Sequence, residues 1–108
     1  MDLAAFRASL SNPAPAPSLS LALQALWRDA RGDWDGAHRL AQEDEGAAGC
    51  WVHAYLHRKE GDSANAAYWY RRAGKPACSA ALDAEWETIA RALLAEHIAL
   101  EHTRPRAT

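Results

Sequence analysis

The stretch GDSANAAYWYRRA (residues 61–73) starts in the same way as an earlier stretch, GDWDGAHRLAQ (residues 32–42), with an offset of 29 positions. In each stretch a glycine ends one helix without a Cβ penalty, and the aspartate after it caps the next helix. The alanines at the sixth position, Ala37 and Ala66, are small enough for two helices to approach closely. A pattern that recurs at a fixed offset in this way predicts two stacked helical hairpins.

Apolar residues on both sides of these stretches recur every three or four positions, which is the spacing of helices. Ser18 is expected to cap the first helix, and the glycine-containing stretch 46–49 to separate the second helix from the third. We therefore expect five helices, over about residues 19–32, 33–45, 50–60, 62–73 and 79–102. The last helix is the longest, and its apolar stripe from Leu82 to Leu100 is expected to close the open end of the stack.

The composition also favours helices over sheet. Of the 108 residues 49% are hydrophobic, and the β-branched apolar residues from which strands are usually built are limited to Val52, Ile89 and Ile98. The length fits one domain, which we expect over residues 19–102. We predict an all-α fold of stacked helical hairpins with a long C-terminal capping helix.

The two ends of the chain are expected to lie outside this domain. Residues 2–10 can form a short helix, and the segment SNPAPAPS (residues 11–18) favours an extended spacer because each proline fixes φ and lacks an N–H. Residues 1–18 are therefore predicted to be an arm that docks on the body or on a neighbouring subunit. The tail at residues 103–108 is predicted to fray.

The charge and the cysteines narrow the class of protein. A formal net charge of -2 and a pI near 6.2 give no reason to expect nucleic acid or an anionic membrane as a partner. The first ten residues lack the form of a secretion signal, and no apolar run approaches the roughly 18 residues of a spanning helix. Cys50 and Cys78 are expected to be reduced thiols. We expect a cytoplasmic protein without membrane contact.

The two stretches resemble the tetratricopeptide and Sel1-like repeats, in which a glycine-acidic turn precedes a helix that carries alanine, then an aromatic residue, then alanine. The second stretch supplies Gly61, Ala66, Tyr70 and Ala73 at the intervals of the family, and the first supplies Gly32, Trp34 and Ala37. The resemblance covers residues 19–76. It implies stacked helical hairpins and a protein- or peptide-binding role.

One face of the second hairpin combines aromatic and polar side chains. Tyr68, Trp69 and Tyr70 spread over about 200° of a helix, so they cannot all face the core. We expect Tyr70 in the core and the other two at a rim. The predicted binding surface consists of His53, His57, Asn65, Tyr68, Trp69 and Arg72. A protein or peptide partner would be anchored by the aromatic rings and oriented by histidine, amide and guanidinium hydrogen bonds.

Two alternatives for this surface stay open. The aromatic side chains can simply fill gaps left by the many alanines. The surface can also be the contact of a homodimer in which the proline-linked arm crosses between subunits. Under the main prediction the chain is a small binding module that needs no cofactor, and the sequence identifies no catalytic residue.

A metal site is the alternative function. His53 and His57 are four residues apart on one helix and can bind one ion, Glu60 is one turn further, and His38 on the preceding helix can join them. A divalent transition metal such as zinc would suit these ligands, in a metal-binding protein or a metal-assisted hydrolase. The pattern is not the zincin motif, because Ala54 stands where that motif has glutamate. The competing interpretation places the histidines between helices as hydrogen-bonded structural residues.

Overall fold

The computed structural model describes the backbone of residues 1–103 and the side chains of residues 1–97, and all regular structure in this part is helical. The elements are α1 (Leu3–Ala8), the 3-10 helix η1 (Ser9–Ser11), α2 (Leu21–Ala30), α3 (Trp34–Glu43), α4 (Ala47–Glu60), α5 (Ser63–Ala73) and α6 (Leu82–Thr103). The all-α prediction is confirmed. Residues 104–108, most of the tail that was predicted to fray, lie outside the described residues.

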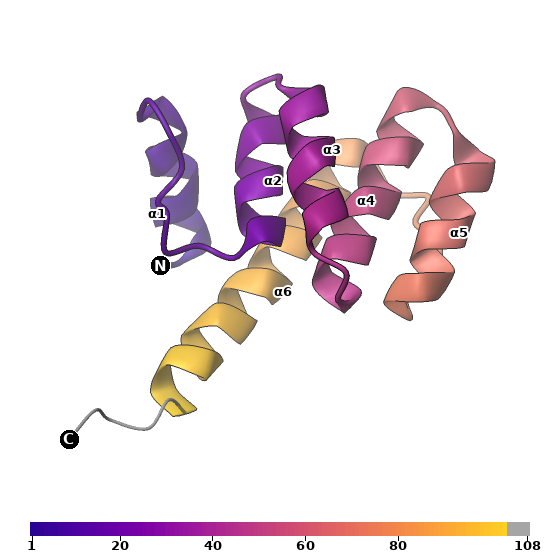
Figure 1. Ribbon diagram of the computed structural model, residues 1–108. Coiled ribbons are helices and arrows are strands. Elements are labelled where there is room, and N and C mark those ends of the chain that lie inside the picture. Colours follow the sequence, from indigo (N-terminus) through magenta and orange to yellow (C-terminus); the bar gives the residue numbers. More distant parts are fainter. Residues whose placement is uncertain (104–108) are drawn as a thin grey trace.

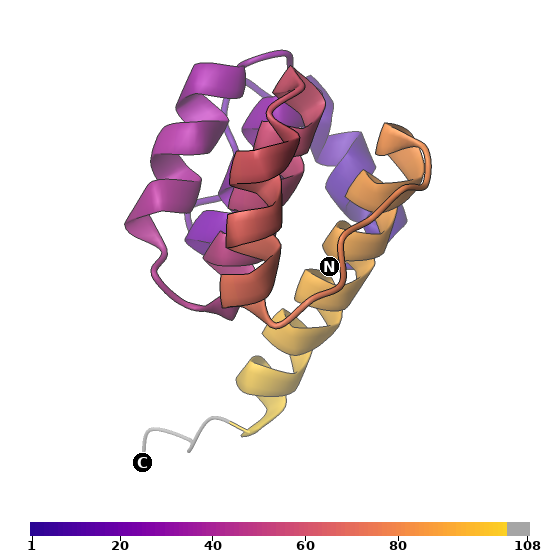
Figure 2. The same ribbon diagram turned by 90° about the vertical axis from the view of Figure 1, so that its right-hand side faces the viewer.

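The helices α2, α3, α4 and α5 stand side by side in chain order (Figure 1), and each packs against the next. The long C-terminal helix that the sequence predicts is present, and the helices that it covers are α1, α2 and α4. In the view turned by 90°, the segment that leads from α5 into α6 crosses beside the stack (Figure 2). No helix among the described residues is long and apolar enough to cross a membrane.

The caps of the two hairpins recur at the offset found in the sequence. The carboxylate of Asp33 accepts a hydrogen bond from the Gly36 amide at 2.9 Å, and that of Asp62 accepts one from the Asn65 amide at 3.2 Å. The N-cap of α2 differs from the predicted one. The helix is capped by Ser20 rather than Ser18, because the Ser20 hydroxyl is the one that accepts from a backbone amide of the first turn.

The glycine-containing stretch between α3 and α4 also has a different role from the predicted one. Helix α4 begins at Ala47, so Gly49 lies inside its first turn, and Gly46 is the N-cap residue. A Cβ atom on Gly49 would lie 2.0 Å from the carbonyl oxygen of Asp44. Glycine is therefore needed at position 49 because the carbonyl of Asp44 approaches the first turn of α4 closely. Gly49 does not end α3.

Gly61 joins the two helices of the second hairpin in a left-handed conformation. Its φ is 91°, and the amide of Asp62 donates to the carbonyl of His57 at 2.9 Å. We expect Gly61→Ala to lower the free energy of unfolding by about 1 kcal/mol, because an L-residue with a Cβ is strained there. Urea denaturation measures the loss. Gly61→Asn, which tolerates this conformation better, should lose less, and an alanine variant as stable as the wild type would contradict the prediction.

The largest fully buried side chains come from the arm, the stack and α6 together. They are Trp27, Phe6, Leu23, Leu26, Leu56, Ile89 and Val52. The Phe6 ring stacks on that of Trp86, with 5.7 Å between the centroids. Trp51 is only partly buried, and the Lys75 ammonium lies 4.3 Å from the centroid of its ring.

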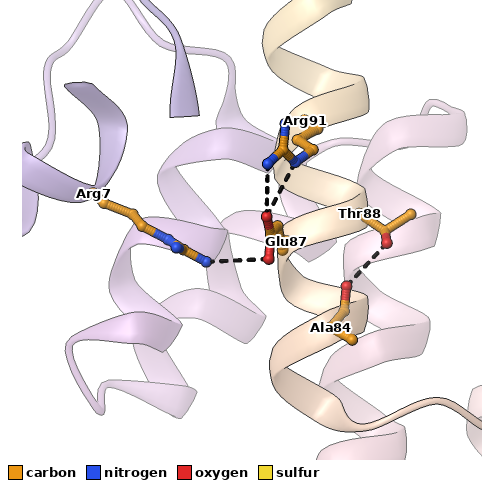
Figure 3. A network of polar contacts seen from close by, with 5 residues as sticks. All are labelled: Arg7, Ala84, Glu87, Thr88 and Arg91. Carbon is orange, nitrogen blue, oxygen red and sulfur yellow. Dashed lines mark hydrogen bonds and ion pairs between the residues drawn. The ribbon is translucent and has the colours of Figure 1, made fainter. Parts of the chain in front are cut away.

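The arm is docked on the body of its own chain. Arg7 on α1 contacts Glu87 on α6 at 3.5 Å, and Arg91, one turn further along α6, holds the same carboxylate at 2.8 Å (Figure 3). The indole N–H of Trp27 donates toward both the hydroxyl and the carbonyl of Ser9. These contacts, with the burial of Phe6, explain why the first ten residues pack against α6 and α2.

Two buried carboxylates connect neighbouring helices: Asp29 joins α2 to α4, and Glu85 joins α6 to α4 and α5. Asp29 on α2 accepts a hydrogen bond from Tyr55 at 3.0 Å and pairs with Lys59 at 2.9 Å. Glu85 on α6 accepts from the Tyr70 hydroxyl and pairs with Arg58 at 2.8 Å. Burial, followed by the neighbouring carboxylates, raises the pKa of both tyrosines, so both stay neutral donors.

Candidate functional site

The fold brings three histidines together between α3 and α4. His53 and His57 stack on one side of α4 with their ring centroids 4.8 Å apart. From α3, His38 meets them, and its Nε2 lies 2.9 Å from Nε2 of His53. One metal-binding nitrogen of each ring lies within 4.8 Å of those of the other two. We call His38, His53 and His57 the histidine cluster.

Tryptophans enclose the cluster from both sides. The ring of Trp34 stacks on His38 with centroids 4.9 Å apart, and Trp69 stacks on His53 with centroids 3.9 Å apart. The indole N–H of Trp34 donates to the carbonyl of Leu56 at 2.9 Å, which fixes the orientation of that wall. The cluster is therefore held between two indole rings.

The protons of the cluster are constrained by this packing. The contact between His38 and His53 requires an N–H on one ring and a lone pair on the other. Burial, together with the charges that His38, His57 and Arg72 can carry, lowers the pKa of His53 to about 4. Burial also lowers the pKa of His38. Both rings are thus neutral at neutral pH. His53 is 3% exposed, and its Nδ1 is buried without a hydrogen-bond partner.

Glu60, predicted as a further ligand, contacts the cluster from its edge. Its carboxylate lies 2.6 Å from Nδ1 of His57, so Nε2 of that ring is the nitrogen left for another partner. This contact fixes the ring orientation of His57. Glu60 is exposed and also lies close to Asp62, with one ligand atom of His57, Glu60 and Asp62 each within 4.8 Å of the others.

The predicted binding residues of α5 lie next to the cluster. Tyr68 is 45% exposed and is the most exposed large hydrophobic side chain among the described residues. The Arg72 guanidinium lies over both Trp69 and Tyr68, at 5.0 and 5.9 Å from the ring centroids. Asn65 is partly buried and donates to the capping carboxylate of Asp62, which gives it a structural role. We call Asn65, Tyr68, Trp69 and Arg72 the aromatic surface.

A small pocket joins the aromatic surface to the cluster. Its volume is about 170 Å³, and it is lined by Ala41, Gln42, Asp44, Glu45, His53, Trp69 and Arg72. His53 thus belongs to both features, because it contacts His38 behind and borders the pocket in front. Tyr70 points the other way and is buried, as predicted.

Two parts of this site are absent from the residues predicted from the sequence. The first is the ring of Trp34, although its spacing of four residues from His38 indicates that the two rings share a side of the helix. The second is the acidic run at residues 43–45. Two of its members, Asp44 and Glu45, line the pocket.

Comparison with known proteins gives no relative from which a role can be transferred. No family model, no curated protein and no solved structure matches the chain. The resemblance to tetratricopeptide and Sel1-like repeats therefore stays a prediction.

Proposed function

We propose that the chain binds a divalent transition metal ion, with zinc as the first choice, at His38, His53 and His57. The observation that carries the proposal is the convergence of one metal-binding nitrogen from each ring within 4.8 Å. A tetrahedral zinc site with bonds of about 2.0 Å spaces its nitrogen ligands by roughly 3.3 Å. The 2.9 Å between the nitrogens of His38 and His53 needs only a small adjustment to reach that spacing.

The donor set supports a transition metal. Three imidazoles suit zinc, copper or nickel, whereas calcium and magnesium prefer oxygen ligands. The lowered pKa values of His38 and His53 keep those rings neutral, which is the form that coordinates a metal. Glu60 on His57 reproduces the carboxylate–histidine pairing that commonly orients a ligand ring.

Three protein ligands leave room for a fourth. Structural zinc sites are usually closed by four protein ligands, whereas catalytic sites keep a position for water or substrate. Metal-assisted hydrolysis is therefore chemistry that this donor set would permit. Binding of the metal is the part of the proposal that the side chains support directly.

Calorimetric titration of chelator-treated protein with zinc chloride tests the proposal. We expect one ion per chain for the wild type. Each of His38→Ala, His53→Ala and His57→Ala should weaken binding by at least about 100-fold, and Glu60→Gln by about tenfold. His97→Ala, which changes a histidine of α6 outside the cluster, serves as the matched control. No saturable binding by the wild type, or equal binding by all variants, would refute the proposal.

A second candidate function is recognition of a protein or peptide through the aromatic surface. The exposure of Tyr68 beside a pocket that Trp69 and Arg72 line supports this function. A partner should be retained by immobilised wild-type protein and lost by Tyr68→Ala and by Arg72→Ala. Leu21→Ala, which removes another exposed apolar side chain, should retain it. Equal retention by all variants would argue against this candidate.

A further inference from the structure

The aromatic surface and its pocket carry both signs of charge. Arg72 lines the pocket from α5, and Glu45 lines it from the turn between α3 and α4. Both residues are exposed, and neither forms an ion pair within the described part of the chain. Two opposite charges thus border one pocket, and the Arg72 guanidinium also donates to the Tyr68 hydroxyl at 3.4 Å.

The same patch also combines an exposed aromatic side chain with a pocket. Tyr68 projects into solvent from α5, and its ring packs edge-on against Trp69, with 5.0 Å between the centroids. Trp69 is in turn one wall of the pocket of about 170 Å³. An exposed aromatic ring therefore lies beside a cavity that is partly aromatic itself.

We propose that a second copy of this chain docks on this patch as a two-fold symmetric dimer. The inference rests on the second candidate function and names its partner. In a two-fold contact the same patch faces itself, so a patch that carries a cation, an anion, a projecting ring and a hollow complements its own copy. Arg72 of one copy meets Glu45 of the other, and each Tyr68 enters the pocket of the other copy.

The charges favour a second copy over a partner of one sign. A strongly acidic segment would meet Glu45 as well as Arg72, and a strongly basic segment would meet the opposite conflict. Asp44, the other acid of the pocket, already accepts a hydrogen bond from the amide of Gly46 at 2.9 Å. Asp44 is also partly buried, so the exposed charged residues of the pocket are Arg72 and Glu45, one of each sign, as a self-complementary contact requires.

The contact lies directly in front of the histidine cluster. It covers Trp69, whose ring stacks on His53, and so shields the outer wall of the cluster from solvent. Dimerisation and metal binding nevertheless use different side chains, because Tyr68, Arg72 and Glu45 are outside the cluster. The two can be tested separately on the same protein.

Size-exclusion chromatography with light scattering, at several concentrations of the full chain, tests the dimer. We expect a concentration-dependent dimer for the wild type. Arg72→Glu and Glu45→Arg should each weaken dimerisation by at least about tenfold, because like charges then face each other. The double variant R72E/E45R should restore it, because each pair is then reversed but again opposite in sign. Tyr68→Ala should also weaken it.

Matched charge reversals outside the pocket, Arg71→Glu and Glu43→Arg, should leave the dimer unchanged. Circular dichroism checks that each variant keeps the wild-type helix content. A wild type that is monomeric at all concentrations overturns the proposal, as does a dimer that survives both single reversals or is not restored in the double variant. A monomer that still captures another protein through Tyr68 and Arg72 would remove the dimer while leaving the second candidate function intact.

Discussion

Replacement of Glu85 by alanine is expected to lower the free energy of unfolding by about 3–5 kcal/mol. The Glu85 carboxylate is 3% exposed and binds both the guanidinium of Arg58 and the hydroxyl of Tyr70. Its removal leaves a partly buried cation and a buried hydroxyl without their acceptor. Because these groups come from α4, α5 and α6, the loss should appear as a lower midpoint of cooperative urea denaturation.

Glu87→Ala is the matched control on the same helix. Glu87 pairs with Arg7 and Arg91 at the surface, where water solvates the charges and the pairs contribute little (Figure 3). Its loss should therefore be much smaller than that of Glu85→Ala. Equal losses for the two variants would mean that burial of the Glu85 network does not hold α6 against the stack.

Acid is expected to destabilise the metal-free protein through His53. The pKa of His53 is about 4 in the folded protein, against 6.5 for an unperturbed histidine, because the ring is buried beside His38 and His57. Between these values the unfolded chain binds more protons than the folded chain, so stability falls as the pH falls. The contribution is fully present above pH 6.5 and lost by pH 4. Its size is about 3 kcal/mol.

Urea denaturation of chelator-treated protein at a series of pH values between 7 and 4 measures this loss. His53→Gln has no group that titrates at this position, so its stability should depend less steeply on pH in that window. The lowered pKa of His38 adds a loss of the same sign that the variant retains. Identical slopes for wild type and His53→Gln would contradict the role assigned to burial of His53.

Much of the fold followed from local signals in the sequence. The caps at Asp33 and Asp62 depend on a side chain and a backbone amide three residues later, so their spacing is visible in the sequence. The choice of Ser20 over Ser18 is not visible in the sequence, because both are acceptable N-cap residues. The predicted role of Gly49 at a helix end is wrong for a similar reason. Glycine is required at this position by the nearby carbonyl of Asp44, a contact that the sequence does not reveal.

In the candidate site, too, some features could be predicted from the sequence and others depend on how the helices pack. That His53 and His57 share one side of α4 follows from a spacing of four residues. The contact of His38 with His53 depends on how α3 packs against α4, which no local pattern gives. The sequence also could not tell that Trp69 would stack on His53 and leave Tyr68 as the more exposed ring.

The proposed metal site is tested most directly by the metal content of untagged protein purified without chelator, measured by elemental mass spectrometry beside a His53→Ala, His57→Ala double variant. We expect close to one equivalent of zinc, or of another divalent transition metal, in the wild type and its loss in the double variant. Protein that carries no such metal after growth with added zinc, or metal that the double variant retains equally, would contradict it.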